Sequence, residues 1–528
     1  MEGRGEMTPP PGSSATPGGH AQVFLDVAPG TERRPGSPQR DDPFHILVLG
    51  NFLGARSSGD GPHGPIQVDR DDIDEVLARF APGLTLPGGD EGVATTLAFQ
   101  ALEDFHPDRL LATVDTLQPL VRWRRELRDP AGARRVVEEA RSMERAGGTP
   151  APPSAESLSG GSLLDRIVGA QDGASGPAGE GMGSGADPGD MGAFLRAVVA
   201  PHLVPDRDPD QLRLLADVEA TLTGQLRRIL HHPPFQALES LWRGVASLTR
   251  QLETGPRLKV HLLQATAADL TWNPDGANGP DGEGGIEASA LFRRLMEQGP
   301  PTRGGRWGLV VADLARAPDA LRTFRCLGAL GRSLGAAVVT AGDPELLGLP
   351  TLVDGELPAS YPVATEPEDT SDAWSRFRTS AEARWLGVAL PRFLLRLPYG
   401  EEGDPCDDLP FEEFPANEAA PHGSYLWGNP GLLCALAMGR TFLEGGWDRL
   451  PGAGRPISGL PLDVRKVGGE ARAKPCGEVL LTEPGVQYLM DVGVMPVASR
   501  KESDSVNLVR LGSAARPLAP LPGPWQVL

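Results

Sequence analysis

The sequence predicts a mixed α/β (α+β) fold made of two domains, each a sheet packed with helices. Three observations lead to this prediction. Short apolar runs typical of buried strands recur along the chain, amphipathic helical segments separate them, and a long segment rich in Gly, Ala, Pro and Ser divides the chain in two. With 528 residues, each part is long enough to bury its own core. We also expect strands near both chain ends and a disordered linker between the domains.

Residues 1–40 form a Gly-, Pro- and Ser-rich N-terminal arm that contains one strand-like segment, residues 21–27. In an extended backbone, Val23, Leu25 and Val27 would place their side chains on one face. No second apolar run lies in the arm to pair with this segment. It is therefore predicted to be an isolated strand whose partner lies elsewhere.

The first domain is predicted to span residues 41–145 and to begin with a buried strand at residues 44–49, an apolar run that ends at a glycine. A helix is expected at residues 71–80, followed by a second strand at residues 93–99. Proline is favourable in the first turn of a helix, and apolar residues then recur at three- to four-residue steps. This pattern predicts one continuous helix over residues 107–128.

Residues 146–190 are rich in Gly, Ala, Pro and Ser, so we expect them to form a flexible linker with little core. One short helix is predicted within the linker at residues 162–170, with Ser162 as its N-cap. The apolar side chains that would share one face of this helix are Leu163, Leu164, Ile167 and Val168.

The second domain is predicted to span residues 191–516 and to open with two long helices. Their apolar stripes run from Leu215 to Ile229 and from Phe235 to Leu252, and a double proline separates them. Further strands are predicted at residues 258–263, 307–311, 336–340 and 478–481, and further helices at residues 319–334, 431–442 and 483–491. A two-stranded ribbon, residues 494–498 and 505–511, and a Pro-rich tail, residues 517–528, complete the chain.

Composition and charge argue against several classes of protein. The chain carries 70 acidic and 50 basic residues, a formal net charge of −20, which opposes binding to a nucleic-acid backbone. Its four cysteines are far apart and lack metal-ligand spacing to histidine, which fits free thiols in a reducing compartment. No apolar stretch reaches the roughly 18 residues of a membrane span. We therefore expect a cytoplasmic protein with no direct membrane insertion and no nucleic-acid partner.

Three patterns could support chemistry, and each has a simpler structural explanation. The glycine turn Gly50–Ser58 follows a buried strand but lacks the Lys and the following Ser or Thr of a phosphate-binding loop. The pair His231–His232 lies near a helix end, where neighbouring residues point about 100° apart and are poorly placed to bind one metal ion. The eight carboxylates of residues 401–418 lack the spacing of a calcium loop and indicate a solvated acidic loop or a patch for a basic partner. No catalytic residue, cofactor or metal site is predicted.

Longer runs of residues resemble a known family, the contractile sheath of the type VI secretion system. The first domain resembles the small subunit (TssB/VipA) in the runs Pro43–Gly54, Val68–Val76, Leu102–Pro107 and Leu117–Leu127. The second domain resembles the large subunit (TssC/VipB) in the runs Ile229–Gly244, Trp374–Arg378, Leu390–Gly400 and Leu426–Asn429. The resemblance implies a structural subunit and not an enzyme, with the two subunits fused in one chain.

The resemblance further implies that copies polymerise into a helical sheath around an inner tube of an Hcp-like protein, together with baseplate components, and contract to drive effector delivery. We expect the strand-like segments near the chain ends to be exchanged between subunits through Val23, Phe24, Leu25, Val27, Val506, Leu508, Val509 and Leu511.

The linker helix is similar to the large-subunit helix that recruits a ClpV-like AAA+ disassembly ATPase, with Leu163, Leu164, Ile167 and Val168 as docking residues. A short helix docked on its own core is the alternative for this segment. Two other functions stay open for the whole chain. They are a non-polymerising assembly adaptor and a phosphate-ligand enzyme that uses Gly50–Ser58.

Overall fold

The fold is known from a computed structural model. It describes residues 42–56, 61–87, 94–129, 132–138, 209–270, 285–300, 305–314, 320–344, 368–414, 421–449, 456–467 and 470–526. The described residues all belong to one unit of the chain, Ser37–Leu528. The predicted arm strand and linker helix lie outside the described residues. We refer below to residues 42–138 as the N-terminal part and to residues 209–526 as the C-terminal part.

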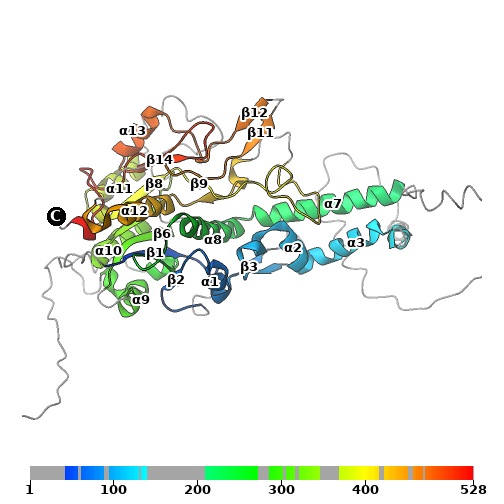
Figure 1. The fold of residues 1–528 in the computed structure, drawn as a ribbon, viewed down its shortest axis with the longest axis horizontal. Coiled ribbons are helices and arrows are strands. Elements are labelled where there is room, and N and C mark those ends of the chain that lie inside the picture. Colours follow the sequence, from blue (N-terminus) through cyan, green and yellow to red (C-terminus); the bar gives the residue numbers. More distant parts are fainter. Residues whose placement is uncertain are drawn as a thin grey trace, which may run out of the picture. The chain divides into compact units, whose positions relative to one another are not determined.

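A sheet of eight strands forms the centre of this unit (Figure 1). Its order is β14-β13-β8-β7-β6-β1-β5-β2, and all neighbours from β13 to β5 are parallel. The two outermost strands, β14 and β2, pair antiparallel with β13 and β5. The strands are β1 (Phe44–Gly50), β2 (Ile66–Val68), β5 (Leu258–Gln264), β6 (Trp307–Asp313), β7 (Ala337–Ala341), β8 (Leu386–Leu390), β13 (Met495–Ser499) and β14 (Val506–Leu508). The predicted mixed α/β fold class is confirmed.

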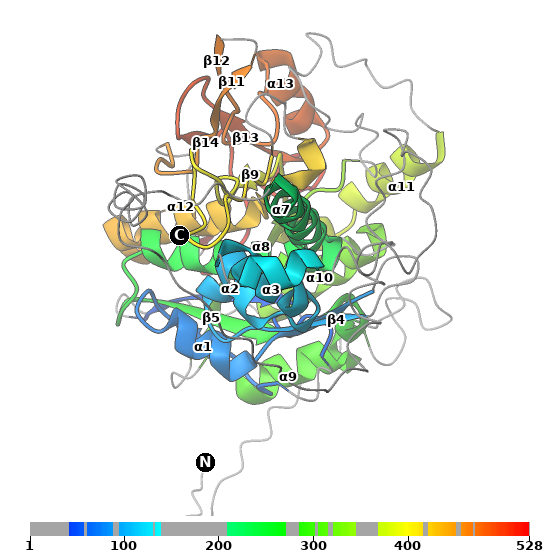
Figure 2. The same ribbon diagram turned by 90° about the vertical axis from the view of Figure 1, so that its right-hand side faces the viewer.

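Helices cover both faces of the sheet, as expected for a mostly parallel sheet (Figure 2). The covering helices are α8 (Pro233–Gln251), α9 (Ala290–Gln298), α10 (Ala320–Leu334) and α12 (Gly431–Gly445). Ile46 and Val48 of β1 share a core with α8 and α12, whereas Leu47 and Leu49 share a core with α9 and α10. Alternate residues of β1 thus face opposite layers, and all seven residues of the strand are buried.

The N-terminal part adds smaller elements to the sheet. They are α1 (Ile73–Phe80), the β3–β4 hairpin (Gly83–Leu86 and Thr95–Ala98), α2 (Pro107–Thr113) and α3 (Gln118–Arg128). α3 packs along α7 (Pro209–Leu230), the first long helix of the C-terminal part. The predicted continuous helix over residues 107–128 is wrong, because Val114 has extended backbone angles and a short 3₁₀ turn separates α2 from α3. Pro119 explains the break, since inside one helix it would clash with the carbonyl of Asp115 and leave that group unbonded.

Most of the other predicted elements form at or near the expected residues. The strand predicted at residues 478–481 is wrong, because these residues form no strand, and the nearest pairing is an isolated bridge from the preceding Gly477 to Phe393. The tail is packed onto the core over its described residues, with Leu521 and Trp525 buried. The remaining elements are α11 (Glu368–Arg378), α13 (Glu483–Asp491) and the two-stranded pairs β9–β10 (Phe393–Leu394 and Trp427–Gly428) and β11–β12 (Val464–Val467 and Glu470–Ala473). Within the described residues, no helix has both the length and the apolar character needed to cross a bilayer.

Candidate functional site

The two parts of the chain meet in the central sheet, where β1 lies between β5 and β6. β1 pairs with β5 from Phe44–Leu258 to Gly50–Gln264, and with β6 from His45–Trp307 to Gly50–Asp313. β5 and β6 are consecutive strands of the C-terminal part, yet both pair with β1 instead of with each other. The separate sheet expected for each part is therefore not formed. The physical reason is that β1 is apolar on both faces, so it is best buried in the interior of a larger sheet with a partner on each edge.

Aromatic side chains from both parts pack together beside the sheet. Phe52 and Phe80 of the N-terminal part lie against Trp242 of α8, with ring centroids 5.1 and 5.6 Å away. The Trp242 indole N–H donates a hydrogen bond of 3.3 Å to the Phe52 carbonyl. A second aromatic group consists of Phe99, Phe105 and Phe235. Burying each of these large side chains contributes about 1.5–3 kcal/mol, so a shared core holds the two parts together.

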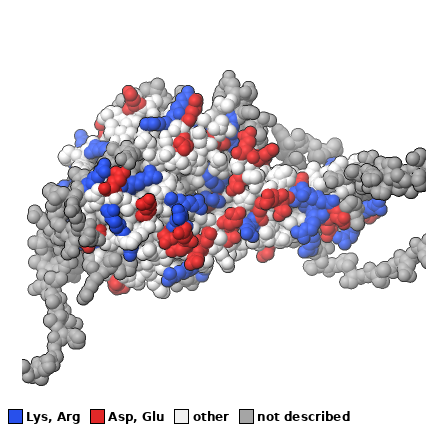
Figure 3. Space-filling view, in the orientation of Figure 1, with Lys and Arg blue, Asp and Glu red and all other residues white. Residues whose placement is uncertain are grey.

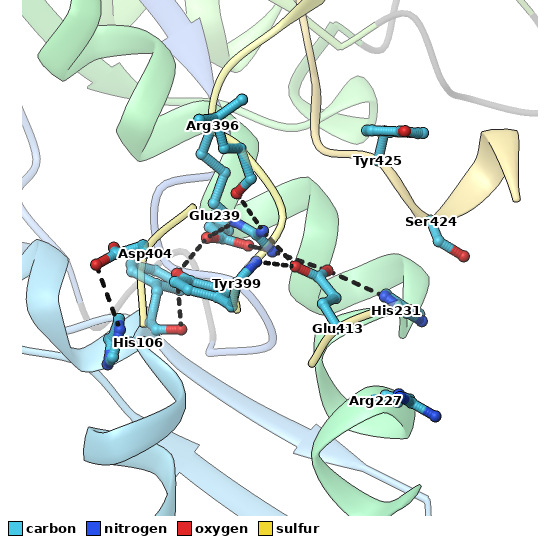
Figure 4. Close-up of polar contacts among 12 residues, drawn as sticks. His106, Arg227, His231, Glu239, Arg396, Tyr399, Asp404, Glu413, Ser424 and Tyr425 are labelled. Atoms are coloured by element: carbon cyan, nitrogen blue, oxygen red, sulfur yellow. Dashed lines mark hydrogen bonds and ion pairs between the residues drawn. The ribbon is translucent and has the colours of Figure 1, made fainter. Parts of the chain in front are cut away.

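A buried group of charged side chains lies next to this core (Figure 4). Arg396 lies between two carboxylates, with Nε donating to Glu239 Oε1 at 2.8 Å and Nη1 donating to Glu413 Oε2 at 2.7 Å. Glu239 is 0% exposed and Glu413 is 1% exposed, so water does not solvate either charge. Burial would raise the pKa of Glu413. The Arg396 charge, with hydrogen bonds from His231, Arg396 and the Tyr399 backbone, lowers it to about 2. Glu413 is therefore ionised and paired at neutral pH.

Tyr399 connects this charged group to the N-terminal part. Its ring packs against the Arg396 guanidinium, 4.1 Å from the ring centroid, and its hydroxyl accepts a hydrogen bond of 2.8 Å from Arg243. The hydroxyl can donate to the Phe105 carbonyl at 3.5 Å or to Glu239 at 3.4 Å. Burial raises the pKa of Tyr399, so the hydroxyl keeps its proton. The network therefore joins α8, the segment after β9 and the N-terminal part.

Comparisons with known proteins connect this shared architecture to a family. Residues 212–514, more than half of the chain, match the VipB family model, described as EvpB/VC_A0108, tail sheath N-terminal domain. Residues 32–143 match a second model, described as type VI secretion system, VipA, VC_A0107 or Hcp2. The chain belongs to the type VI secretion tail sheath family. The presence of a VipA region and a VipB region in one polypeptide confirms the predicted fusion.

A curated relative of this sheath protein is the type VI secretion system sheath protein TssC1 of Pseudomonas aeruginosa strain PAO1. The two are 28% identical over 312 residues, which cover 58% of this chain and 61% of the length of TssC1. The matched family is a structural sheath component. In the sheet of this sheath protein, the VipA region contributes β1 and β2, and the VipB region contributes the other strands.

In the VipB region, the residues predicted for strand exchange lie at one end of the sheet. Val506 and Leu508 belong to β14, which is shorter than the predicted strand over residues 505–511, and Val509 and Leu511 follow it. On the side away from β13, Val506 exchanges two backbone hydrogen bonds with Ile457, at 2.8 and 2.9 Å. β14 is thus paired on both sides at Val506 within the described chain. The predicted residues that lie outside the described chain are Val23, Phe24, Leu25, Val27, Leu163, Leu164, Ile167 and Val168.

The acidic loop of the VipB region, predicted over residues 401–418, is only partly solvated over its described residues, 401–414. Its exposed acids are Glu401, Glu402, Asp404, Asp407 and Asp408. The prediction of a solvated loop is wrong for Glu413, because this side chain is buried against Arg396. His231 does follow the end of α7, and its ring stacks on Phe414 with Nε2 3.0 Å from Glu413 Oε1. Sequence reasoning missed this network, although Glu239 and Arg396 lie in two of the runs that resemble the large subunit.

The glycine turn after β1 uses its backbone N–H groups within the protein. Leu53 donates to the Gln264 side chain at 3.1 Å, and Ala55 donates to the Gly83 carbonyl at 2.8 Å. Gly54 has a φ of +69°, and a Cβ atom there would lie 2.6 Å from the Gly83 carbonyl oxygen. Because these N–H groups are already paired, the geometry favours a structural turn over a phosphate-binding loop.

Proposed function

We propose that this sheath protein polymerises into a helical sheath around an inner tube of an Hcp-like protein and contracts to drive effector delivery. The observation that carries the proposal is the position of β1 of the VipA region between β5 and β6 of the VipB region. Because both regions share one sheet in one chain, each copy is a complete building block with a one-to-one ratio of the two subunits. Membership of the tail sheath family supports the sheath role of that block.

Contraction in this proposal relies on contacts between copies and uses no bond chemistry. Heterologous contacts whose rotation does not close produce an open helical filament. A polymer with two stable packings of the same subunits releases free energy when it changes from one packing to the other. A block with a continuous shared core, such as the one formed around β1, stays intact while the contacts between blocks change.

Surface charge supports such contacts between copies. On the face drawn in Figure 3, basic side chains gather at the end formed by α3, which exposes Arg122 and Arg125. The acidic loop exposes charge of the opposite sign, including Glu401 and Asp407. Complementary patches of this kind orient protein partners and suppress wrong pairings. We infer that head-to-tail packing of copies brings surfaces of opposite charge together.

Strand exchange at the chain ends is the second element of the proposal. A donated strand of about six residues makes about five backbone hydrogen bonds, each worth roughly 0.5–1.5 kcal/mol. Val23, Phe24, Leu25 and Val27 form the donated arm in this proposal. The β14 end of the sheet takes part in this proposal through Val506, Leu508, Val509 and Leu511. Its support is that β14 is an outermost strand of the sheet, and exchange there would have to replace the pairing of Val506 with Ile457.

The remaining partners of the proposal follow from the family. They are baseplate components and a ClpV-like AAA+ ATPase that docks on Leu163, Leu164, Ile167 and Val168, and the site of action is the cytoplasm. A synthetic peptide of residues 158–172 is expected to bind the N-domain of that ATPase. Absence of binding would favour the alternative, a short helix that packs against the core of its own chain.

Negative-stain electron microscopy of the purified full-length chain tests the proposed function directly. Tubular polymers are expected, whereas discrete particles at every protein concentration would refute the sheath role and favour an assembly adaptor. Nucleotide binding measured by calorimetry would favour the phosphate-ligand enzyme. Deleting residues 1–40 is expected to abolish polymers, and deleting residues 1–18, which keeps the arm strand, is the matched control. Normal polymers from the longer deletion would reject the N-terminal arm but not the sheath.

A further inference from the structure

Three potential metal ligands, from the VipA region and the VipB region, lie together where these two regions are in contact. His106 and Asp108 lie at the start of α2 in the VipA region, and Cys406 lies in the acidic loop of the VipB region. One ligand atom from each residue lies within 4.8 Å of the other two. An imidazole nitrogen, a carboxylate oxygen and a thiol sulfur are the donor types found in zinc sites. A role in polymerisation does not explain why these three types converge from distant segments.

Asp108 has one carboxylate oxygen with a partner and one without. Its Oδ2 accepts a hydrogen bond of 2.9 Å from the Asp407 backbone N–H. Its Oδ1 is buried and has no hydrogen-bond partner among the described residues. A buried polar atom without a partner is unfavourable, and for a carboxylate oxygen a cation is a suitable partner. Asp108 thus has a coordinating atom to spare beside His106 and Cys406.

His106 is held in an orientation suited to coordination through Nδ1. Its side chain is 8% exposed, and its ring packs edge-on against Tyr399 with centroids 4.9 Å apart. Nδ1 lies 3.6 Å from Asp108 Oδ2, the oxygen that also accepts the Asp407 N–H, and this distance is close to the spacing of adjacent ligands around a tetrahedral ion with bonds of about 2.0 Å. The Asp108 backbone N–H now donates to Nδ1 at 3.2 Å, and coordination would replace this one hydrogen bond.

The other ring nitrogen of His106 has a carboxylate nearby. Nε2 lies 3.8 Å from Asp404 Oδ1. With an ion on Nδ1, Nε2 carries the ring proton and directs it towards this carboxylate. Histidine ligands of metal ions almost always have such a partner, which sets the tautomer and the ring orientation.

The surroundings of Cys406 are negatively charged. The carboxylates of Asp108, Asp404, Asp407 and Glu412 act electrostatically on the Cys406 thiol. The acidic loop itself contains no Lys or Arg. A divalent cation would reverse this situation, because it neutralises the carboxylates and binds the thiolate in preference to the thiol.

We propose that His106, Asp108 and Cys406 bind one divalent transition-metal ion of the zinc type, with water as the fourth ligand. Binding forms bonds from the ion to the imidazole nitrogen, the carboxylate oxygen and the thiolate sulfur, and it releases the Cys406 thiol proton to solvent. The ion ties α2 of the VipA region to the acidic loop of the VipB region. Ca²⁺ and Mg²⁺ do not fit this site, because both prefer oxygen ligands.

Metal content and cobalt spectroscopy test this proposal on the full-length chain. After chelator treatment, incubation with excess Zn²⁺ and gel filtration, elemental analysis is expected to find about one zinc ion per chain. Co²⁺, used as a spectroscopic substitute, is expected to show a thiolate-to-cobalt charge-transfer band. Cys406→Ser should remove this band, and both Cys406→Ser and His106→Gln should weaken zinc binding at least tenfold. Asp408→Asn, which changes an exposed acid of the same loop, is the control and should bind as the unchanged protein does.

Three results would overturn the proposal. The first is a chain that retains no zinc above the level of a chelator-treated blank. The second is Co²⁺ binding without a thiolate band, and the third is zinc binding that Cys406→Ser leaves unchanged, because in both cases the ion would lie on surface carboxylates. The zinc content and cobalt spectrum of the unchanged protein decide the proposal even where a variant fails to fold. Circular dichroism identifies such a variant.

Discussion

Replacing Arg396 by Met tests how strongly the buried charged network supports the fold. The change removes the guanidinium that donates to Glu239 at 2.8 Å and to Glu413 at 2.7 Å, while methionine retains much of the apolar stem. Glu239 keeps its ion pair with Arg243, and Glu413 keeps His231. Removing one partner of a buried ion pair costs about 3–5 kcal/mol, because the remaining charge stays buried with too little compensation.

The loss is measured as a drop in the midpoint of thermal unfolding, by calorimetry of the purified chain. With an unfolding entropy of about 2.1 cal/mol/K per residue and about 340 residues in the described part of the chain, 3–5 kcal/mol lowers the midpoint by about 4–7 °C. Arg449→Met is the matched control, because Arg449 is 55% exposed and its pair with Glu444 lies at the surface. Its shift should stay within about 1 °C. Equal shifts for the two variants would refute the reasoning. Adding Glu413→Gln to Arg396→Met should recover part of the loss, since it removes the uncompensated charge.

Three further predictions concern the shared sheet. Replacing Ile46, which is 0% exposed in β1, by Ala is expected to cost about 2–5 kcal/mol of unfolding free energy because it leaves a cavity, and an unchanged urea midpoint would contradict this packing. Lowering the pH from about 7.5 to about 5 is expected to destabilise the protein. Burial, and next the charge of Lys259, holds the pKa of His45 at about 4. Burial, and next the charge of His45, holds the pKa of His261 at about 3, so both values lie below the ordinary 6.5. The unfolded chain then binds more protons than the folded chain, so stability is full above about pH 6.5 and falls by about 2 kcal/mol per histidine at pH 5. His261→Gln should halve that loss, and a urea midpoint independent of pH over this range would disprove the assignment. Cleavage within residues 146–190 is expected to leave two fragments that elute together on a sizing column, because β1 stays between β5 and β6, and separate elution would argue against the shared sheet.

The sequence by itself was sufficient wherever the physical signal is local. α13 (Glu483–Asp491) forms at the predicted residues, because Thr482 caps its start by accepting a hydrogen bond from the Gly485 N–H and a proline occupies its first turn. β1 was predictable from an uninterrupted apolar run, which suits a strand buried on both faces. The break between α2 and α3 also has a local cause, Pro119, although the continuous helix predicted over residues 107–128 missed it. Long matching runs identified the sheath family for the same reason, because they depend on residue identity alone.

Only the tertiary structure decided which distant segments meet. Nothing in Phe44–Gly50 marks β5 and β6 as its neighbours, because backbone hydrogen bonds between strands are the same for almost any residue. In the sequence, Glu413 does not differ from the other acids of its loop. It is buried because Arg396 lies beside it, and Arg396 is also bonded to Glu239 of α8. Periodicity reports which face of an element is buried, but pairing depends on the geometry of the whole core. The contact between the VipA and VipB regions, and the potential metal ligands that lie there, are therefore determined by the tertiary structure and could not be deduced from the sequence alone.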